Sequence, residues 1–272
     1  MCDVRRGGAS WYVLTHDIWL TTSLYIDGDR GGRRDHRRED DEAVDRAVRG
    51  LDNGGGVREG GWGAYLANHY SRSADVVLRG YNMRWAAMVV DRAVVVGAAW
   101  PAAVTVCFGA NDASLPDRAS KLQHVPLPEY KENLRAICDL LLARWPSVVV
   151  ILVTPPPIHD HARVRYQCGD GCSGLPERTN ESAGAYARAC VEVAAERGLR
   201  AIDIWSKMQR FPGWENSSLR DGLHLTPRGN RMVFEEVVFA LKDASLGLDA
   251  LPADLPLFCD TDPNNPVKSF HE

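Results

Sequence analysis

The sequence contains no uninterrupted apolar run that approaches the roughly 18 to 20 residues of a membrane-spanning helix. It also lacks an excess of positive charge, because its formal net charge is -4 at pH 7. A strongly basic balance is the usual electrostatic footprint of a nucleic-acid-binding protein. We therefore expect a soluble protein with neither a membrane span nor a nucleic-acid partner.

The N-terminal pattern also lacks the features of a secretory leader. Arg5 and Arg6 could open such a leader, but the apolar run over residues 11–20 is interrupted by polar residues at 15–17. No small-residue cleavage site follows that run. We accordingly expect a cytoplasmic location.

The cysteines do not form the paired framework of a small secreted domain. There are seven of them, an odd number spread over 272 residues, which favours reduced thiols. Cys107, Cys138 and Cys190 fall within apolar patterns and are expected in the core. Cys168 and Cys172 bracket a Gly-Asp-Gly loop, and no second ligand pair lies at zinc-like spacing. The sequence therefore indicates no metal site.

Apolar residues are scarce between positions 27 and 59. Residues 28–42 are dense in charge and glycine, and a run of three glycines follows at 54–56, which predicts disorder. The arginines within 33–38 could form a nucleic-acid patch, but interleaved acidic residues argue against one.

The rest of the chain is rich enough in apolar residues to bury one sizeable core. We predict three parts: a largely disordered segment over residues 1–58, one domain over 59–245, and an extended C-terminal tail over 246–272. In that tail, residues 255–258 form the only apolar anchor.

Beyond Gly60, predicted strands and helices alternate. The strands are continuous apolar runs, which indicates a parallel sheet covered by helices on both faces, a three-layer α/β/α sandwich. We expect strands at 75–78, 103–108, 147–153 and 199–204, and helices at 62–70, 84–96, 129–145, 177–197 and 227–242.

A carboxylate and an imidazole stand three residues apart before the last predicted helix. Thr226 is typical of an N-cap and Pro227 of a first helical residue, so the helix start is fixed. Asp221 can accept a hydrogen bond from one ring nitrogen of His224, which leaves the other nitrogen free to move a proton. Taken alone, the same spacing also fits a capped turn.

Other candidates lie at the carboxyl ends of predicted strands, where ligands bind in such sheets. Gly80 and Asn111 each follow a strand, although the first could simply end its strand and the second could be a turn residue or a helix cap. His159 and His161, beyond the run of three prolines, are expected to be loop residues that face solvent.

Taken together, these segments resemble the GDSL, or SGNH, esterase family, and in particular its isoamyl-acetate-hydrolysing branch of plants and fungi. The resemblance rests on ordered motifs from about Gly60 onward. They are Gly60-Gly61-Trp62-Gly63, Arg79-Gly80-Tyr81-Asn82-Met83-Arg84-Trp85, Gly109-Ala110-Asn111-Asp112, Thr154-Pro155-Pro156-Pro157, Gly174-Leu175-Pro176-Glu177-Arg178-Thr179-Asn180, Asp221-Gly222-Leu223-His224 and Leu251-Pro252-Ala253-Asp254.

The resemblance implies a serine esterase on a flavodoxin-like sandwich that acts on small esters of short acyl chains without metal or cofactor. It makes His224 the general base and Asp221 the acid that orients it. It also makes the Asn111 side-chain amide and the Gly80 backbone N–H the donors to the oxyanion. A flavin-binding flavodoxin-like protein is less favoured, since no phosphate-cradling loop follows an early strand.

The sequence departs from the family at the nucleophile. The family's Gly-Asp-Ser motif should stand about ten residues before Gly60, where this chain has Leu51-Asp52-Asn53-Gly54. The nearest upstream match is Gly28-Asp29-Arg30, and the only upstream serines, Ser10 and Ser23, do not follow a strand and sharp turn. The nucleophile is therefore unknown.

Two hypotheses explain this departure. Residues 1–58 could result from a wrong start or a misread exon boundary, or the chain could be a non-catalytic relative that binds acyl or alcohol groups. In either case the family's central first strand must be replaced. We predict that residues 11–14 or residues 23–26 take its place.

Overall fold

The computed structural model describes residues 9–15, 60–80, 83–94, 100–169, 174–251 and 256–270. Its centre is a five-stranded sheet with the order β2-β1-β3-β4-β5, in which every strand pairs parallel to its neighbours. The strands are β1 (Ala9–Thr15), β2 (Ala74–Gly80), β3 (Pro101–Cys107), β4 (Val149–Val153) and β5 (Arg200–Ile202).

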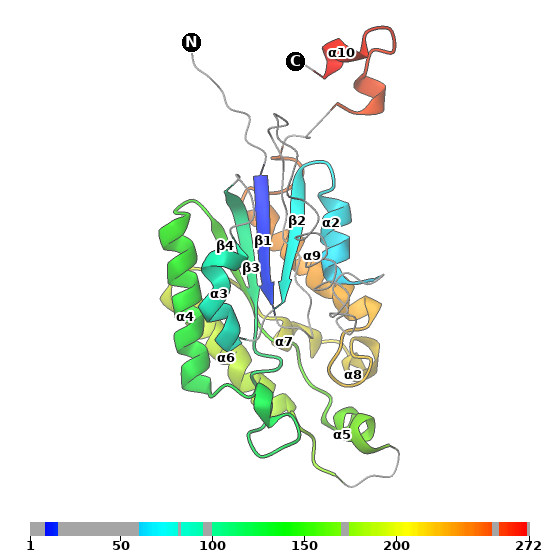
Figure 1. Cartoon of the computed structure of the whole chain (residues 1–272). Coiled ribbons are helices and arrows are strands. Elements are labelled where there is room, and N and C mark those ends of the chain that lie inside the picture. The colour runs from blue at the N-terminus through cyan, green and yellow to red at the C-terminus, as the bar shows by residue number, and fades with distance from the viewer. Residues whose placement is uncertain are drawn as a thin grey trace, which may run out of the picture.

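Helices cover both faces of this sheet (Figure 1). The helices α3 (Met83–Ala93), α4 (Leu127–Arg144) and α6 (Asn180–Glu196) pack on one face. The other face carries α2 (Trp62–His69), α7 (Ile204–Met208) and α9 (Pro227–Asp243). The predicted three-layer parallel sandwich is confirmed. The shorter elements are α5 (Asp160–Cys168), α8 (Trp214–Ser217), α10 (Pro266–Ser269) and the 3-10 turns η1 (Lys121–Gln123) and η2 (Phe258–Asp260).

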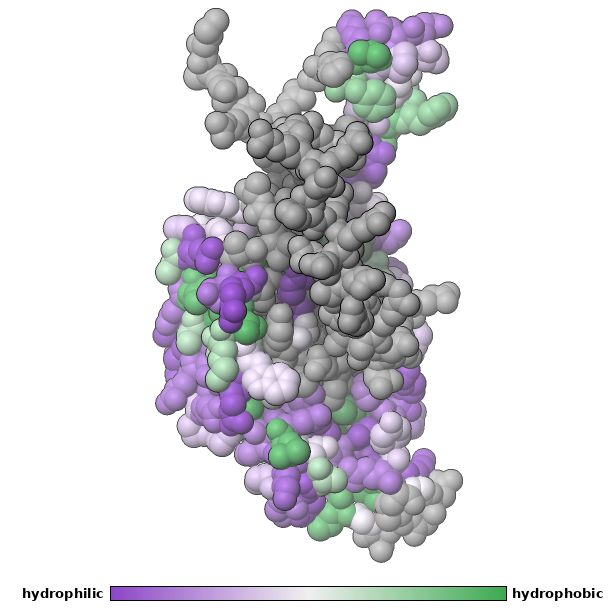
Figure 2. All heavy atoms as spheres, viewed as in Figure 1, coloured by the Kyte–Doolittle hydropathy of each residue, from purple (hydrophilic) through white to green (hydrophobic). Residues whose placement is uncertain are grey.

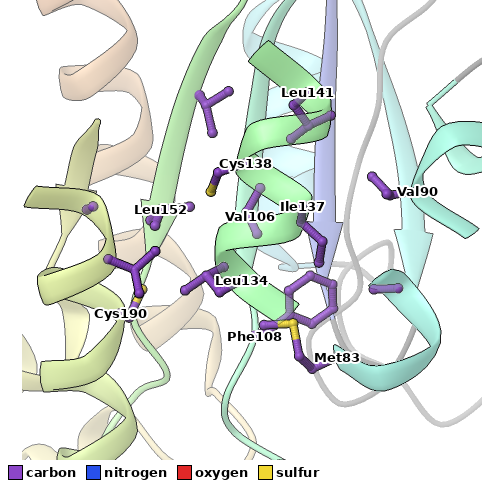
Figure 3. Packing of buried hydrophobic residues seen from close by; sticks show 14 of the residues in the cluster. Met83, Val90, Val106, Phe108, Leu134, Ile137, Cys138, Leu141, Leu152 and Cys190 are labelled. Carbon is purple, nitrogen blue, oxygen red and sulfur yellow. The ribbon is translucent and has the colours of Figure 1, made fainter. Parts of the chain in front are cut away.

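Alternate residues of the central strands supply two separate cores. In β3, Val104 and Val106 pack toward α4 and α6, whereas Ala103 and Cys107 pack toward α2 and α9. Burial on both faces explains why these strands are continuous apolar runs rather than alternating ones. Figure 3 shows the first core, where Cys138 lies among apolar side chains. All three cysteines predicted to be internal are buried free thiols.

The position of the family's first strand is occupied by β1, which is one of the two segments predicted to take that place. β1 contains Trp11 to Leu14 and lies between β2 and β3. The other candidate, residues 23–26, lies outside the described residues, as does the rest of 16–59. The prediction that an N-terminal run replaces the missing strand is confirmed for residues 11–14.

Some predicted boundaries were wrong. The helix predicted from residue 177 begins at Asn180, because Thr179 is its N-cap and accepts a hydrogen bond from the Ser182 N–H at 3.1 Å. Glu177 and Arg178 therefore stand in the preceding segment and are free to serve the site. The predicted loop after the proline run is helical, since α5 contains His161 and His159 is its N-cap.

The expected anchor of the tail is also wrong. Phe258 is 98% exposed and Leu257 is 48% exposed, and the tail forms η2 and α10 instead of a fully extended chain. Figure 1 shows this segment projecting from the sheet, and Figure 2 shows its apolar side chains on the surface. Elsewhere on the face shown in Figure 2, the surface of the described residues is mostly hydrophilic.

Candidate active site

The loop that follows β3 holds Asn111 in a fixed turn. Gly109 adopts a φ of +116°, and a Cβ at this position would lie 2.9 Å from the Pro155 ring, so only glycine fits. The Asp112 carboxylate accepts a hydrogen bond from the Gly109 N–H at 2.9 Å. Asn111 itself is 1% exposed. The turn thus presents the amide at the carboxyl end of β3.

Asp112 is a buried carboxyl whose role the sequence did not indicate. Its burial is complete, which raises its pKa to about 6, while the N–H of Gly109 opposes that rise. The backbone carbonyl of Asp112 also accepts from the Val125 N–H at 3.2 Å. This residue therefore ties the Asn111 turn to the chain that enters α4.

A tight turn before α9 presents Asp221 and His224. The turn is closed by a bridge between Leu219 and Leu225 and by a hydrogen bond from the Arg220 N–H to the His224 carbonyl at 2.8 Å. At its tip, Gly222 has a φ of +82°, and a Cβ there would lie 2.6 Å from the His159 carbonyl oxygen. The turn is consequently pressed against the start of α5.

The predicted capping of α9 is confirmed. The Thr226 side chain accepts a hydrogen bond from the Gly229 N–H at 3.2 Å, and Pro227 is the first helical residue. Because the helix start is fixed in this way, Asp221 and His224, which precede it directly, have a defined position relative to the sheet.

Asp221 and His224 form the hydrogen bond that their spacing predicts. His224 Nδ1 lies 2.6 Å from Asp221 Oδ2, and Asp221 Oδ1 accepts from the His224 N–H at 2.8 Å and the Leu223 N–H at 3.1 Å. The His224 side chain is 20% exposed, and that of Asp221 is 11% exposed. The carboxylate is therefore sheltered, and the ring still reaches solvent.

Opposing effects act on the pKa of the Asp221 carboxyl. Burial raises it, but hydrogen bonds from the side chain and backbone of His224, together with the charges of His224 and Arg163, lower it well below its usual range. Arg163 Nη1 lies 3.4 Å from Asp221 Oδ2. The carboxyl is thus ionised at any pH near neutrality.

This depressed pKa predicts a pH-dependent contribution to stability. The folded-state pKa lies below the unfolded value, so the contribution is complete above about pH 4 and is lost as the pH falls further. We expect Asp221→Asn to lower the free energy of unfolding by on the order of 2 kcal/mol at pH 7. Urea denaturation of both chains from pH 7 to pH 2.5 should show this difference shrinking below pH 4. A difference that stays constant would contradict the assignment.

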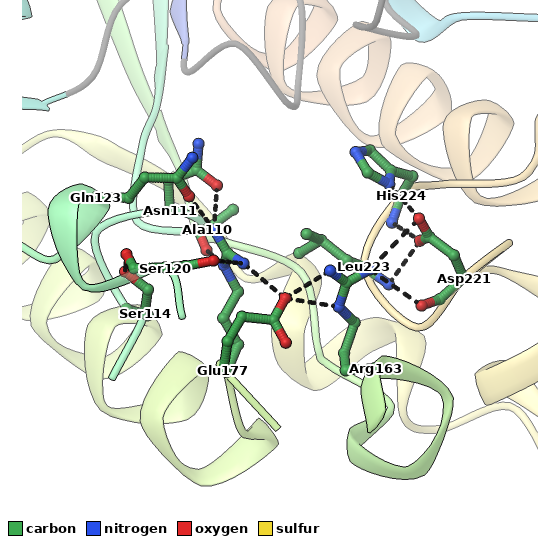
Figure 4. A network of polar contacts seen from close by, with 12 residues as sticks. Ala110, Asn111, Ser114, Ser120, Gln123, Arg163, Glu177, Asp221, Leu223 and His224 are labelled. Atoms are coloured by element: carbon green, nitrogen blue, oxygen red, sulfur yellow. Dashed lines mark hydrogen bonds and ion pairs between the residues drawn. The ribbon is translucent and has the colours of Figure 1, made fainter. Parts of the chain in front are cut away.

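Asn111 and His224 stand at the two ends of one polar network. Figure 4 shows this network, in which hydrogen bonds lead from the Asn111 amide through Arg178, Glu177, Arg163 and Asp221 to the His224 ring. Three of the predicted site residues, Asn111, Asp221 and His224, therefore belong to one hydrogen-bonded network.

The fourth predicted site residue, Gly80, is the last residue of β2 and pairs in register with Thr15, whose other neighbour is Cys107. The carboxyl ends of β1, β2 and β3 thus lie side by side. The donation from the Gly80 N–H to an oxyanion stays a prediction.

Three charged residues of this network carried no predicted role. Arg163, Glu177 and Arg178 are 5%, 1% and 3% exposed, respectively. Glu177 and Arg178 belong to the Gly174–Asn180 motif, which contributed only to the family resemblance. No sequence pattern pointed to Arg163, which lies in α5, a helix within a stretch predicted to be a loop. The only pattern that could have indicated the network was the adjacent pair Glu177-Arg178, a charged pair of opposite sign between Pro176 and Thr179.

The sequence matches a known family over most of its length. A family model described as GDSL-like lipase/acylhydrolase matches residues 28–237, which is more than half of the chain. The chain belongs to this family.

Curated GDSL relatives align over most of their own length. A GDSL esterase/lipase of Arabidopsis thaliana is 55% identical over 221 residues, which cover 79% of this chain and 92% of the relative. An isoamyl acetate-hydrolyzing esterase 1 homolog of Rattus norvegicus is 40% identical over 219 residues, covering 78% of this chain and 86% of the relative. The chain is thus a member of a family of carboxylic ester hydrolases.

Solved structures support the fold of this GDSL family member. A hydrolase from the metagenome of Lake Arreo, Spain, has a TM-score of 0.55 at 18% identity and covers 87% of this chain and 96% of its own. An acetyl-xylooligosaccharide esterase mutant from Geobacillus has a TM-score of 0.52 at 19% identity, covering 87% of this chain and 95% of its own. Among the described residues, no helix has the length and apolar character needed to cross a bilayer.

Proposed function

We propose that this site is built to hydrolyse small carboxylic esters of short acyl chains by a Ser-His-Asp mechanism. We further propose that the encoded chain lacks the serine, so that its hydrolysis is impaired. The observation that carries the proposal is the 2.6 Å contact between Asp221 Oδ2 and His224 Nδ1. The Asn111 amide stands at the far end of the same hydrogen-bonded network.

Each residue then has a defined role in the reaction. A serine hydroxyl attacks the ester carbonyl while His224, through the ring nitrogen that Asp221 does not hold, removes the hydroxyl proton. The Asn111 amide and the Gly80 N–H donate to the oxygen as its negative charge develops, each contributing about 3 kcal/mol. His224 passes its proton to the leaving alcohol. Water then attacks the acyl group in the same way, and the serine is released.

Asp221 sets the tautomer of the ring in this scheme. Because its carboxylate accepts from Nδ1–H, the other ring nitrogen presents a lone pair to the hydroxyl. The same carboxylate stabilises the ring once it is charged. The sheltered position of Asp221 strengthens both effects, because fewer water molecules compete for it.

The choice of short acyl esters is supported by the names of the relatives. Several are isoamyl acetate-hydrolyzing esterase 1 homologs, including one of Bos taurus that is 44% identical over 186 residues. Isoamyl acetate joins a two-carbon acyl group to a branched alcohol. We extend this substrate class to the present chain.

The proposed loss of the nucleophile is supported by the position of Ser10. Ser10 pairs with Asp75 and Pro101 at the amino ends of β2 and β3, five residues before Thr15. At about 3.3 Å per residue, it lies about 17 Å along the strand from the edge that holds the site. Ser23 lies outside the described residues.

A wrong start or a misread exon boundary is our preferred origin of this loss. It is supported by the change near Gly60 from charge-dense, glycine-rich sequence to a regular alternation of apolar strand and helix patterns. Peptide mass spectrometry of the native protein tests it. Recovery of peptides from residues 38–58 would rule this origin out.

A second candidate function is a binding protein for acyl or alcohol groups without turnover, favoured by the absence of Gly-Asp-Ser upstream of Gly60. A fluorophosphonate probe distinguishes an active enzyme from a chain without a nucleophile. We expect the unaltered chain to show no stoichiometric labelling and to hydrolyse a short-chain nitrophenyl ester poorly. Stoichiometric labelling at any serine would overturn the proposed loss. Binding of isoamyl alcohol with no hydrolysis, even after a serine is restored, would favour the binding protein.

A further inference from the structure

A single buried carboxylate connects the two halves of the site. Glu177 Oε1 accepts from Arg178 Nη1 at 2.8 Å and from Arg163 Nε at 2.9 Å. Its side chain is 1% exposed, and those of the two arginines are 6% or less. Charged groups are buried at a large cost unless they are paired, and here one carboxylate pairs with both guanidinium groups.

One arm of this arrangement reaches the predicted oxyanion donor. Arg178 Nη2 donates to Asn111 Oδ1 at 2.9 Å, and Arg178 Nε donates to the neighbouring Ala110 carbonyl at 3.1 Å. A guanidinium can only donate, so it holds the amide with its oxygen toward the arginine. The Asn111 NH₂ group is thereby turned away from Arg178, as its role as a donor requires.

The other arm reaches the predicted acid-base pair. Arg163 Nη1 donates to the Asp221 carbonyl at 3.3 Å and lies 3.4 Å from the Asp221 carboxylate. Asp221 in turn holds His224. Two guanidinium groups thus face two carboxylates, and the charges of this part of the network balance.

The residues of this network come from four separate segments of the chain. Asn111 follows β3, Arg163 lies in α5, Glu177 and Arg178 precede α6, and Asp221 precedes α9. Backbone hydrogen bonds of 2.9 Å join the first and third segments, from the Leu115 N–H to the Glu177 carbonyl, and the second and fourth, from the His159 N–H to the Gly222 carbonyl. Side-chain contacts then connect these two pairs, namely Glu177 with Arg163 and Asp160 with the Asn180 N–H.

We propose that Glu177 is a positioning residue that fixes the oxyanion donor Asn111 relative to the Asp221-His224 pair. It acts on Asn111 through Arg178 and on Asp221 through Arg163. The proposal rests on the proposed function for the roles of Asn111 and His224. The coupling of the two ends is a property of the folded chain and can be measured without substrate.

The test is a pair of NMR observations on the full-length chain labelled with ¹⁵N in histidine and asparagine. The Nδ1–H proton of His224 reports its hydrogen bond to Asp221, and the side-chain amide of Asn111 reports the orientation set by Arg178. We expect Glu177→Gln to shift or abolish both signals, because it leaves two guanidinium groups against one carboxylate. The control is Glu196→Gln, in which an exposed glutamate of α6 loses its charge beside Arg135. It should leave both signals unchanged.

A folded Glu177→Gln variant with both signals unchanged would overturn the proposal. If this variant does not fold, Arg178→Lys and Arg163→Lys test the same coupling, since each keeps its charge but loses the planar fork. We expect Arg178→Lys to move the distant His224 signal and Arg163→Lys to move the distant Asn111 signal. If each variant moves only the nearer signal, the coupling through Glu177 is wrong.

A kinetic measurement separates this inference from the proposed function. In a chain with a restored serine, Glu177→Gln should lower kcat for a short-chain nitrophenyl ester by about 100-fold, the size of effect that misplaced catalytic groups produce. KM should change little, because Glu177 lies behind the reacting groups. If the restored chain hydrolyses nothing while both NMR signals still respond to Glu177→Gln, the proposed function fails and the inference stands.

Discussion

The double substitution His16→Gly and Ile18→Ser is expected to raise kcat/KM for a short-chain nitrophenyl ester by about 1,000-fold. These changes place a Gly-Asp-Ser sequence around Asp17, directly after β1. Removing the serine from a hydrolytic triad costs a factor of about 10⁶ in kcat, with a residual contribution from the other groups. Restoring it in a sequence that has not been optimised should recover a part of that factor.

The position of the substitutions follows from the register of β1. Thr15, the last residue of the strand, pairs with Gly80 and Cys107, so the chain leaves the sheet beside two of the strand ends that carry the site. Asn111 follows Cys107 by four residues, within the turn held by Asp112. A serine three residues beyond Thr15 therefore starts from the correct edge of the sheet.

The matched control is His16→Gly combined with Ile18→Ala, which has the same backbone changes but no hydroxyl. Hydrolysis and fluorophosphonate labelling should appear only with the serine. A second chain should carry a family-type N-terminus in place of residues 1–58. If both serine-containing chains fold, by circular dichroism, and neither hydrolyses the ester, the assignment of Asp221 and His224 to ester hydrolysis is wrong.

In the serine-restored chain, Asp221→Asn is expected to lower kcat by about 10⁴-fold. The amide would offer a donor or a weaker acceptor to His224 Nδ1, which now lies 2.6 Å from a carboxylate oxygen. The ring would then lose the tautomer that removes a proton from serine, and its charged form would lose its stabilising partner. KM should change much less, because Asp221 lies behind the ring.

Asp243→Asn is a suitable control for this measurement. Asp243 is the last residue of α9 and pairs with Arg200 on the surface, with a side chain that is 66% exposed. Exposed ion pairs contribute little, so both kcat and stability should remain close to those of the parent chain. An Asp221→Asn variant that loses less than about tenfold in kcat would show that this carboxylate does not orient the base.

Local chemistry made several features of the structure predictable. The Thr226-Pro227 pair sets the start of α9 within a few residues of sequence, and the Asp221-His224 contact depends on that same short turn. The continuous apolar runs of β3 and β4 reflect burial on both faces, which needs no knowledge of their partners. These features could be read from neighbouring residues.

Long-range pairing made the rest unpredictable. Arg163 and Glu177 are 14 residues apart, and Arg178 is 67 residues from Asn111, so no short pattern relates them. A charge run such as Glu177-Arg178 would ordinarily be a solvated surface, and only the fold shows that it is buried. The tail shows the opposite error, because Phe258 looked like an anchor and is almost fully exposed.

Because β1 lies between β2 and β3, the first part of the chain has a role in assembling the sheet that is separate from catalysis. With β1 removed, β2 would be detached from the other three strands, and two rows of backbone hydrogen-bonding groups would face each other across a gap. Any substitute leading sequence must therefore pair in parallel over seven residues with β2 and over six with β3 before it can contribute a nucleophile. A leading sequence that pairs with both neighbouring strands can therefore complete the sheet whether or not it supplies a reactive hydroxyl.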